Sequence, residues 1–284
     1  MSHSLVAPSA AAVLADVRRA LQEDMGPGDA SADLVPAHVM AEATVICRDA
    51  AVICGAPWFD ACLRELDPDM HIEWLVNDGD HVAADTLLCH LQGRARALLS
   101  GERSALNFLQ TLSATATVSA AYVAAVAGTD TTILDTRKTL PGLRVAQKYA
   151  VRCGGGSNHR MGLHDAILIK ENHITAAGNL TTAVLTARTK HPSLPLEVEV
   201  EDLQELELAL LAGVDRIMLD EFDDDMIRHA VARVDGQVPL EVSGSVELPR
   251  LASLARMGVD YISIGALTKH IRAVDLSMRI NFRR

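Results

Sequence analysis

Six short apolar runs follow one another in the second half of the chain, and they constrain the fold more than any other feature. They lie at Thr132–Leu134, Ala166–Ile169, Leu196–Val200, Arg216–Leu219, Leu240–Val242 and Tyr261–Ile264. Helical patterns separate them, most clearly at Leu203–Ala212, Asp224–Val234 and Glu247–Met257. Short strands that alternate with helices are typical of a parallel sheet with crossover helices. Six such units fit a doubly wound sheet or a barrel with fewer than eight strands, and we favour the barrel.

Polar or glycine residues follow every one of these runs. They are Asp135 to Lys138, Lys170 to His173, Glu199 and Glu201, Asp220 and Glu221, Ser243 to Ser245, and Gly265 and Ala266. In a barrel the residues after each strand share one rim, and that rim carries the chemistry. Six polar strand ends in succession therefore argue against a purely structural protein.

The residues before Gly128 have a different pattern. A helix is expected over Ala10–Glu23 and a long one over Ser100–Ala127. Strands are expected at Ala43–Arg48, Ile72–Val76 and Leu87–Leu91. This part therefore reads as an α+β domain with a small antiparallel sheet.

Charge is distributed unevenly along the chain. The formal net charge is −11, which disfavours a nucleic-acid partner because phosphate binding relies on clustered cations. Between Arg137 and Lys170, however, there are seven basic residues and one acidic residue. Such an island suggests a concave site for a small, multiply charged anion. The alternative is that these cations are scattered over a helix surface.

Other features limit the location of the protein. The apolar segment from Leu5 to Ala15 is interrupted by Pro8 and has no basic residue before it, so we expect no signal peptide. No stretch approaches the ~20 apolar residues that a membrane span needs. The five cysteines form no CxxC pair, which disfavours a disulfide framework or a zinc site. We therefore expect a cytoplasmic protein with no membrane partner.

The predicted rim combines cations with two carboxylates. Arg137, Lys138, Arg160 and Lys170 suit two or more anionic groups. Glu199 and Asp220, on neighbouring strands, fit a hard cation such as Mg²⁺ placed between them and a pyrophosphate. The alternative is that these carboxylates form salt bridges with the rim cations.

Three loops complete the predicted rim. Ser243-Gly244-Ser245 and Gly265-Ala266 follow the last two strands, where barrels build phosphate sites from backbone N–H groups, although ordinary turn glycines would look the same. The run from Gly154 to Gly156 precedes Ser157-Asn158-His159-Arg160 and suits backbone that passes close to a ligand. His159 is either a ligand-binding group or a packed imidazole. Cys153 is better explained as a buried structural cysteine than as an activated thiol.

Three long motifs resemble quinolinate phosphoribosyltransferase. They are DTRKTLPGLR from Asp135, KYAVRCGGGSNHR from Lys148 and LIKENHI from Leu168. The resemblance covers nearly the whole chain and includes EDMGPGD from Glu23, GERSALN from Gly101 and GVDYISIGALT from Gly258. Two positions depart from the family pattern: Ser31, where threonine is frequent, and Ser245, where many members have glycine.

The fold that this resemblance implies is an incomplete α/β barrel of parallel strands with an N-terminal α+β sandwich domain. The domains would be residues 1–128, completed by residues 270–284, and residues 129–269. Family members are dimers, so the resemblance also implies a homodimer in which Arg103 is donated to the neighbouring site.

The implied reaction joins quinolinate to 5-phosphoribosyl 1-pyrophosphate with Mg²⁺, giving nicotinate mononucleotide, pyrophosphate and CO₂ in de novo NAD biosynthesis. Lys138, Lys170, Glu199 and Asp220 would be catalytic, with Glu199 and Asp220 holding the metal. The implied substrate-binding set is Arg103, Thr136, Arg137, Lys138, His159, Arg160, Lys170, Ser243, Gly244, Ser245, Ile264, Gly265 and Ala266.

Two other functions are weighed against this one. One is a molybdenum-transport-associated phosphoribosyltransferase homologue of the same fold, and the complete basic set with Arg103 favours quinolinate instead. The other is a non-catalytic barrel that binds a metabolite, which would not need Glu199 and Asp220.

Overall fold

The computed structural model describes residues 5–244 and 246–282 of the 284-residue chain. These residues form two compact units. The first comprises the residues up to Ala120, Thr139–Gly155 and those from Leu267 onward, and the second comprises Ala121–Lys138 and Gly156–Ala266. This grouping differs from a single division at residue 128, because helix α4 (Arg144–Cys153) belongs to the first unit.

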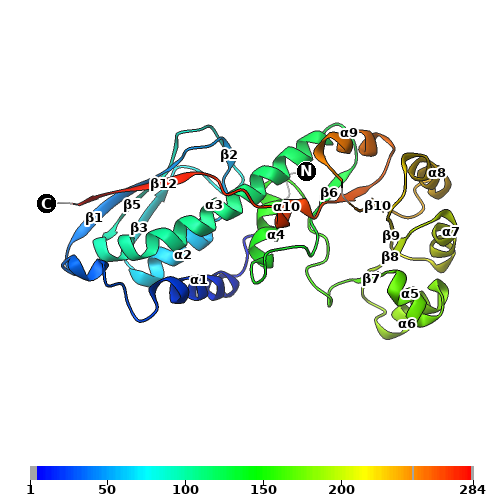
Figure 1. Ribbon diagram of the computed structural model, residues 1–284, viewed down its shortest axis with the longest axis horizontal. Helices are drawn as coiled ribbons and strands as arrows, with labels where there is room; N and C mark the ends of the chain where they lie inside the picture. The colour runs from blue at the N-terminus through cyan, green and yellow to red at the C-terminus, as the bar shows by residue number, and fades with distance from the viewer. Residues whose placement is uncertain (1–4, 245, 283–284) are drawn as a thin grey trace. The chain divides into compact units, whose positions relative to one another are not determined.

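The first unit contains a four-stranded antiparallel sheet in the order β12-β1-β5-β3. Its strands are β1 (Met40–Cys47), β3 (His71–Trp74), β5 (Thr86–Arg94) and β12 (Leu276–Phe282). Val45 of the central strand β1 lies opposite Cys89 on one side and Met278 on the other. Figure 1 shows the red C-terminal strand beside the blue strand β1, so the two ends of the chain build one sheet.

Helices supply the rest of the core of the first unit. They are α1 (Ala10–Met25), α2 (Ala56–Leu66), α3 (Ala95–Ala125) and α4, with a 3₁₀ turn at Ala32–Leu34 and a small ladder of β2 (Ala51–Val52) with β4 (His81–Val82). Alternate residues of β1 are buried, as a sheet covered on one face requires. Trp58, Leu63 and Leu109 are completely buried. A Cβ on Gly101 of α3 would lie 2.8 Å from the Leu63 side chain, so glycine permits the close approach of α2.

Helix α2 begins after a glycine and is capped by a side chain from a distant part of the chain. Gly55 has φ +121°, a backbone conformation that favours glycine, and Pro57 follows in the first turn. Asp78 accepts hydrogen bonds from the amides of Gly55 (3.0 Å) and Ala56 (3.1 Å), and from the Tyr149 hydroxyl (2.9 Å). The sequence pattern alone did not predict this helix, because its cap lies more than twenty residues away in the chain.

The second unit is built on six parallel strands in the order β6-β11-β10-β9-β8-β7. They are β6 (Thr132–Leu134), β7 (Ile167–Ile169), β8 (Leu196–Val200), β9 (Arg216–Leu219), β10 (Leu240–Val242) and β11 (Tyr261–Ser263). The two edge strands, β6 and β7, pair with β11 and β8 respectively and not with each other. The unit is therefore the incomplete α/β barrel that the sequence predicts.

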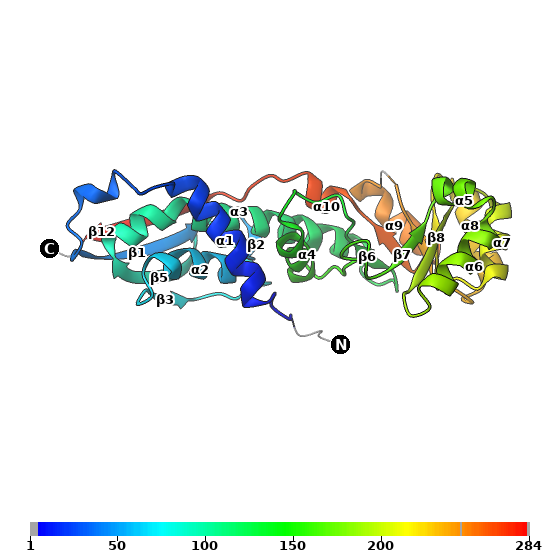
Figure 2. The same ribbon diagram turned by 90° about the horizontal axis from the view of Figure 1, so that it is seen from below.

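The crossover helices of this unit are α5 (Glu171–Ala177), α6 (Leu180–Lys190), α7 (Leu203–Ala212), α8 (Asp224–Val234) and α9 (Leu248–Arg256). The short α10 (Ala266–Lys269) follows β11, and all of it but Ala266 belongs to the first unit. Figure 2 shows α6, α7 and α8 together on one side of β7 and β8. Asp202 and Asp223 cap α7 and α8, each accepting two backbone N–H groups of the first turn. The other side of the sheet faces the barrel interior, where the site lies.

The structure bears on the expectations about membrane-spanning segments and about the cysteines. None of the helices in residues 5–244 and 246–282 is long and apolar enough to cross a membrane. All five cysteines are buried free thiols.

Candidate active site

A pocket of about 160 Å³ opens among the strands of the second unit, at their carboxyl ends. Its lining is Thr136, Arg137, Lys138, His159, Arg160, Leu168, Lys170, Glu199, Met218, Ser243 and Ser263. Four of the seven cations in the basic segment thus meet at one site, whereas Arg144, Lys148 and Arg152 lie on α4 of the first unit. The first group is gathered as an anion site would require, whereas the second group lies on one helix, where Lys148 is completely buried.

The turn after β6 brings two of these cations to the pocket. Its backbone folds back so that the Thr136 hydroxyl accepts a hydrogen bond from the amide of Lys138 at 3.1 Å. Gly265, just after β11, faces the Lys138 side chain, and a Cβ there would lie 2.9 Å from Lys138 Cδ. The absence of a side chain at Gly265 therefore leaves room for Lys138.

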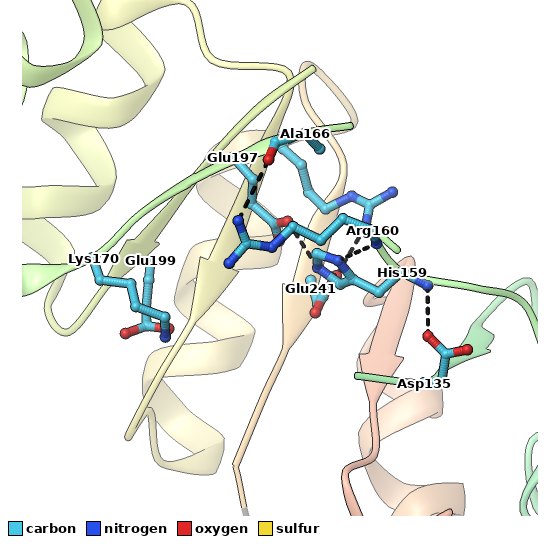
Figure 3. Close-up of polar contacts among 9 residues, drawn as sticks. Asp135, His159, Arg160, Ala166, Lys170, Glu197, Glu199 and Glu241 are labelled. Atoms are coloured by element: carbon cyan, nitrogen blue, oxygen red, sulfur yellow. Dashed lines mark hydrogen bonds and ion pairs between the residues drawn. The ribbon is translucent and has the colours of Figure 1, made fainter. Parts of the chain in front are cut away.

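The segment after the three glycines is tied to the same strand end. Asp135 is completely buried and accepts hydrogen bonds from the His159 amide (2.9 Å) and from Asn158 Nδ2 (2.5 Å). The amide of Ser157 also donates to the Ile133 carbonyl at 2.9 Å. These bonds fix the direction in which His159 and Arg160 enter the barrel (Figure 3).

Two guanidinium groups of like charge lie close together in the pocket. Burial first, and then the charge of Arg137, lower the pKa of Arg160. Arg160 is steadied by a contact from Nη1 to the Ala166 carbonyl at 3.4 Å. The charges of Glu197 and Asp165 act in the opposite direction on the same pKa, so two carboxylates of this chain offset part of the repulsion between the guanidinium groups.

Lys170 and Glu199 form an ion pair on the other side of the pocket (Figure 3). The salt-bridge alternative for Glu199 is therefore realised in this structure. Further carboxylates crowd this end of β8 and β9. The pKa of Glu201 is raised, first by loss of solvent and then by four neighbouring carboxylates. These carboxylates belong to Glu171, Glu205, Asp220 and Glu199. The charges of Glu199 and Asp220 thus both act on Glu201, and carboxylate oxygens are the donors that hard divalent cations prefer, although Glu199 is paired with Lys170 in this structure.

A second group of charged side chains fills the barrel interior, and the sequence interpretation missed it. Glu197 of β8 and Glu241 of β10 are buried, and their Oε2 atoms lie 3.0 Å and 3.6 Å from His159 Nε2. Arg216 Nη1 is 3.0 Å from Glu241, and its guanidinium lies over the Tyr261 ring at 4.1 Å. Burial first, and then the charge of Glu197, raise the pKa of Glu241 to about 7.

The expectation that these strands are apolar is therefore wrong for β8, β9 and β10. Residues i and i+2 of a strand share a face, so Glu197 and Glu199 both point into the barrel, at two depths (Figure 3). The alternation of leucine or valine with glutamate in Leu196–Val200 was the available signal.

Family models cover almost the whole chain. Residues 29–113 match the model described as "Quinolinate phosphoribosyl transferase, N-terminal domain", and residues 115–279 match the corresponding C-terminal domain. The chain belongs to the quinolinate phosphoribosyltransferase family.

Individual relatives agree with this family assignment. A "Probable nicotinate-nucleotide pyrophosphorylase [carboxylating]" from Synechocystis sp. is 42% identical over 264 residues, covering 92% of this chain and 90% of the relative. A "Nicotinate-nucleotide pyrophosphorylase [carboxylating]" from Mycobacterium leprae is 41% identical over 272 residues, covering 92% and 95%. Among solved structures, the nicotinate-nucleotide pyrophosphorylase from Francisella tularensis has a TM-score of 0.92 at 42% identity, covering 99% and 100% of the two chains.

The remaining residues that the resemblance to the quinolinate phosphoribosyltransferase family assigns to the site lie as follows. Ser243 lines the pocket, Gly244 has φ +129°, and Ser245 lies outside the described residues. The amide of Ile264 donates to the Leu134 carbonyl at 2.9 Å, next to Gly265, and Ala266 begins α10. Arg103 lies on α3 in the first unit, where its side chain is 62% exposed.

Proposed function

We propose that the protein transfers the phosphoribosyl group of 5-phosphoribosyl 1-pyrophosphate to quinolinate, with loss of CO₂. The products are nicotinate mononucleotide, pyrophosphate and CO₂, and the reaction serves de novo NAD biosynthesis. The observation that carries this proposal is the meeting of Arg137 and Arg160 with Lys138 and Lys170 in one pocket. A substrate with two adjacent carboxylates offsets the mutual repulsion of these cations.

The reaction needs no protein nucleophile. The pyridine nitrogen attacks C1′ of the ribose, and the bond from C1′ to the pyrophosphate oxygen breaks. The C–C bond to the 2-carboxylate of the cationic ring then breaks, its electron pair stays on the ring carbon, and that carbon takes a proton. Arg137 and Arg160 hold the carboxylates, while Lys138 and Lys170 face the charge that develops on the leaving pyrophosphate.

A divalent metal, Mg²⁺, is part of the same proposal. Glu199 and Asp220 would hold it, and when bound it would neutralise charge on the leaving pyrophosphate. Lys170 would then leave its ion pair with Glu199 and contact a substrate oxygen instead. Loss of turnover in EDTA, restored by Mg²⁺, is the expected result, and full activity in EDTA would contradict it.

We further propose a homodimer in which Arg103 completes the partner's site. Arg103→Ala and Lys170→Ala homodimers should each be nearly inactive. Random pairing after co-refolding equal amounts gives roughly half heterodimers, each with one intact site, so about a quarter of the wild-type activity should return. No recovery after demonstrated subunit exchange would reject the shared site and leave the assigned reaction standing.

Two further parts of this proposal concern organisation and location. The chain would consist of two functional domains. The first would be residues 1–128, completed by residues 270–284, and the second would be residues 129–269. A cytoplasmic location is proposed with it.

Release of ¹⁴CO₂ from quinolinate labelled in the 2-carboxylate tests the function directly. Release should depend on 5-phosphoribosyl 1-pyrophosphate and should yield nicotinate mononucleotide in equal amount. Nicotinate, which lacks the 2-carboxylate, is the control: losing one charge-assisted pair costs about 1.5–3 kcal/mol, so it should be used poorly. A comparable kcat/KM for nicotinate, or no labelled CO₂, would reject the assignment.

A further inference from the structure

Both ring nitrogens of His159 lie close to polar groups inside the second unit. Nδ1 accepts a hydrogen bond from the backbone amide of Arg160 at 2.7 Å. An acceptor needs a free lone pair, so Nδ1 carries no proton and the ring proton lies on Nε2. Nε2 faces Glu197 Oε2 at 3.0 Å and Glu241 Oε2 at 3.6 Å (Figure 3). The geometry therefore fits the neutral tautomer, not a doubly protonated imidazolium.

The surroundings of the ring hold it in this orientation. The His159 backbone amide donates to Asp135, and the His159 side chain is only 9% exposed. Glu241 is fixed in turn by Arg216, whose guanidinium rests on the Tyr261 ring. Main chain, ring and carboxylates thus form one connected network that ends at the amide of Arg160, and Arg160 lines the pocket.

A metal site is the competing interpretation of the same side chains. His159, Glu197 and Glu241 present ligand atoms within 4.8 Å of one another. A neutral histidine that binds a metal through Nε2 must carry its proton on Nδ1. That proton would point at the Arg160 N–H, which already donates to Nδ1 at 2.7 Å. Two donors would then face each other, so the hydrogen bonding favours a proton, and not a metal, on Nε2.

We propose that Glu197 and Glu241 are positioning residues which hold His159 as the neutral Nε2–H tautomer, and that His159 in turn fixes the backbone of Arg160 at the pocket. His159 then supplies no positive charge to the substrate. The carboxylates of the substrate are left to the arginines and lysines of the pocket. The tautomer stands on the hydrogen bond from the Arg160 amide to Nδ1 and on the distances from Nε2 to the two carboxylates, whereas its kinetic consequence rests on the proposed function.

Nitrogen NMR tests the tautomer without substrate or activity. Deuterated protein with ¹⁵N-labelled histidine gives long-range ring correlations, and His159→Asn identifies the signal. The expected pattern at neutral pH is an unprotonated Nδ1 and a protonated Nε2, shifted by Glu197→Gln. A ring with protons on both nitrogens, or on Nδ1 alone, overturns the proposal. Stoichiometric binding of added Zn²⁺ that perturbs this signal and is lost in Glu241→Gln would also overturn it, in favour of a metal site.

Kinetics separates positioning from direct substrate binding. Asparagine retains an acceptor near the position of Nδ1, whereas leucine retains none. His159→Leu should raise the KM for quinolinate about tenfold or more, because Arg160 loses its fixed position, and His159→Asn should recover part of that loss. Glu197→Gln should change the same KM more than the KM of the phosphoribosyl donor. The exposed His229→Asn is the matched control and should leave both unchanged.

Equal losses in the leucine and asparagine variants would show that the ring acts through its charge, and would reject the positioning role. Should Glu241→Gln fail to fold, the wild-type NMR pattern and Glu197→Gln still decide. A protein with the expected tautomer but no labelled CO₂ release would reject the proposed function and retain the network.

Discussion

The two units bury acidic side chains for different purposes. In the first unit, Asp67 and Asp78 accept backbone N–H groups near the ends of α2, and Asp16 accepts the indole N–H of Trp58. In the second unit, Glu197 and Glu241 face a ring and a guanidinium that come from other segments. Acids of the first kind hold main chain or a core indole in place, whereas those of the second kind hold a side chain that lines the pocket. The comparison predicts that substitutions of the buried acids in the first unit reduce stability, whereas substitutions at the pocket of the second unit reduce activity.

The largest effect is expected at Lys170 of the second unit. If the proposed function holds, Lys170→Ala removes a cation that faces the leaving group, and loss of one such group lowers kcat by about 10²–10³. Stability should change by less than about 1 kcal/mol, because the lysine is 44% exposed. Steady-state kinetics and urea unfolding measure both, with Lys190→Ala on the exposed end of α6 as control. A large loss of stability with unchanged kcat would break the comparison.

The next effect is expected in the first unit, at Asp67. Its side chain is 1% exposed and accepts the amide of Arg94 at 2.8 Å. Asp67→Ala leaves that donor unpaired, which should lower the free energy of unfolding by about 1–3 kcal/mol. The kcat/KM of the folded fraction should not change. Asp69→Ala, at an exposed position two residues away, should be close to neutral in the same unfolding experiment.

A smaller, pH-dependent effect is expected at Glu241. Because its pKa is raised to about 7 in the folded chain, the folded state keeps a proton that the unfolded state loses above about pH 4.5. Stability from this group is therefore present at low pH and is lost as the pH rises towards 7. Unfolding of wild type and Glu241→Gln at a series of pH values should show this slope in the wild type only. Parallel curves between pH 4.5 and 7 would contradict the raised pKa.

The smallest effect is expected on the outer helices of the barrel. Glu207 of α7 and Arg233 of α8 form an ion pair at 2.5 Å, with both side chains about two-fifths exposed (41% and 42%). Exposed pairs contribute about 0–1 kcal/mol, so Glu207→Gln should change neither stability beyond that range nor kcat. A larger loss of stability, measured by thermal unfolding at low and high salt, would show that charged pairs on the outer helices also stabilise the second unit.

The sequence predicted the barrel because its strands lie at regular intervals and their helices have clear patterns. The bounds of β8, β9 and β10 agree with the expected runs, and α7 and α8 agree with the expected helices. Elements that depend on long-range contacts were harder to predict. Helix α2 is an example, because its cap comes from Asp78 and no local pattern reveals it. α3 begins at Ala95 rather than Ser100 because alanine and arginine continue the helix without a breaker.

The candidate site was predictable where motifs are contiguous. Arg137, Lys138, Arg160 and Lys170 line one pocket as the rim argument expects. The inner pair Glu197 and Glu241 was missed because the two runs that contain them were treated as apolar strands. Whether such a residue points inward depends on which face the barrel closes over, and this becomes known only when the strands are assembled.

The tie between Ser157 and β6 has a consequence for solubility. The Ser157 amide and carbonyl bond to Ile133 and Asp135, so this residue covers part of the free edge of the sheet. Uncovered edges invite pairing with other chains. The segment that carries His159 and Arg160 therefore also guards against aggregation. If this segment detached from β6 during synthesis or heating, the protein would aggregate as well as lose activity. A loss of soluble yield would then accompany the loss of turnover.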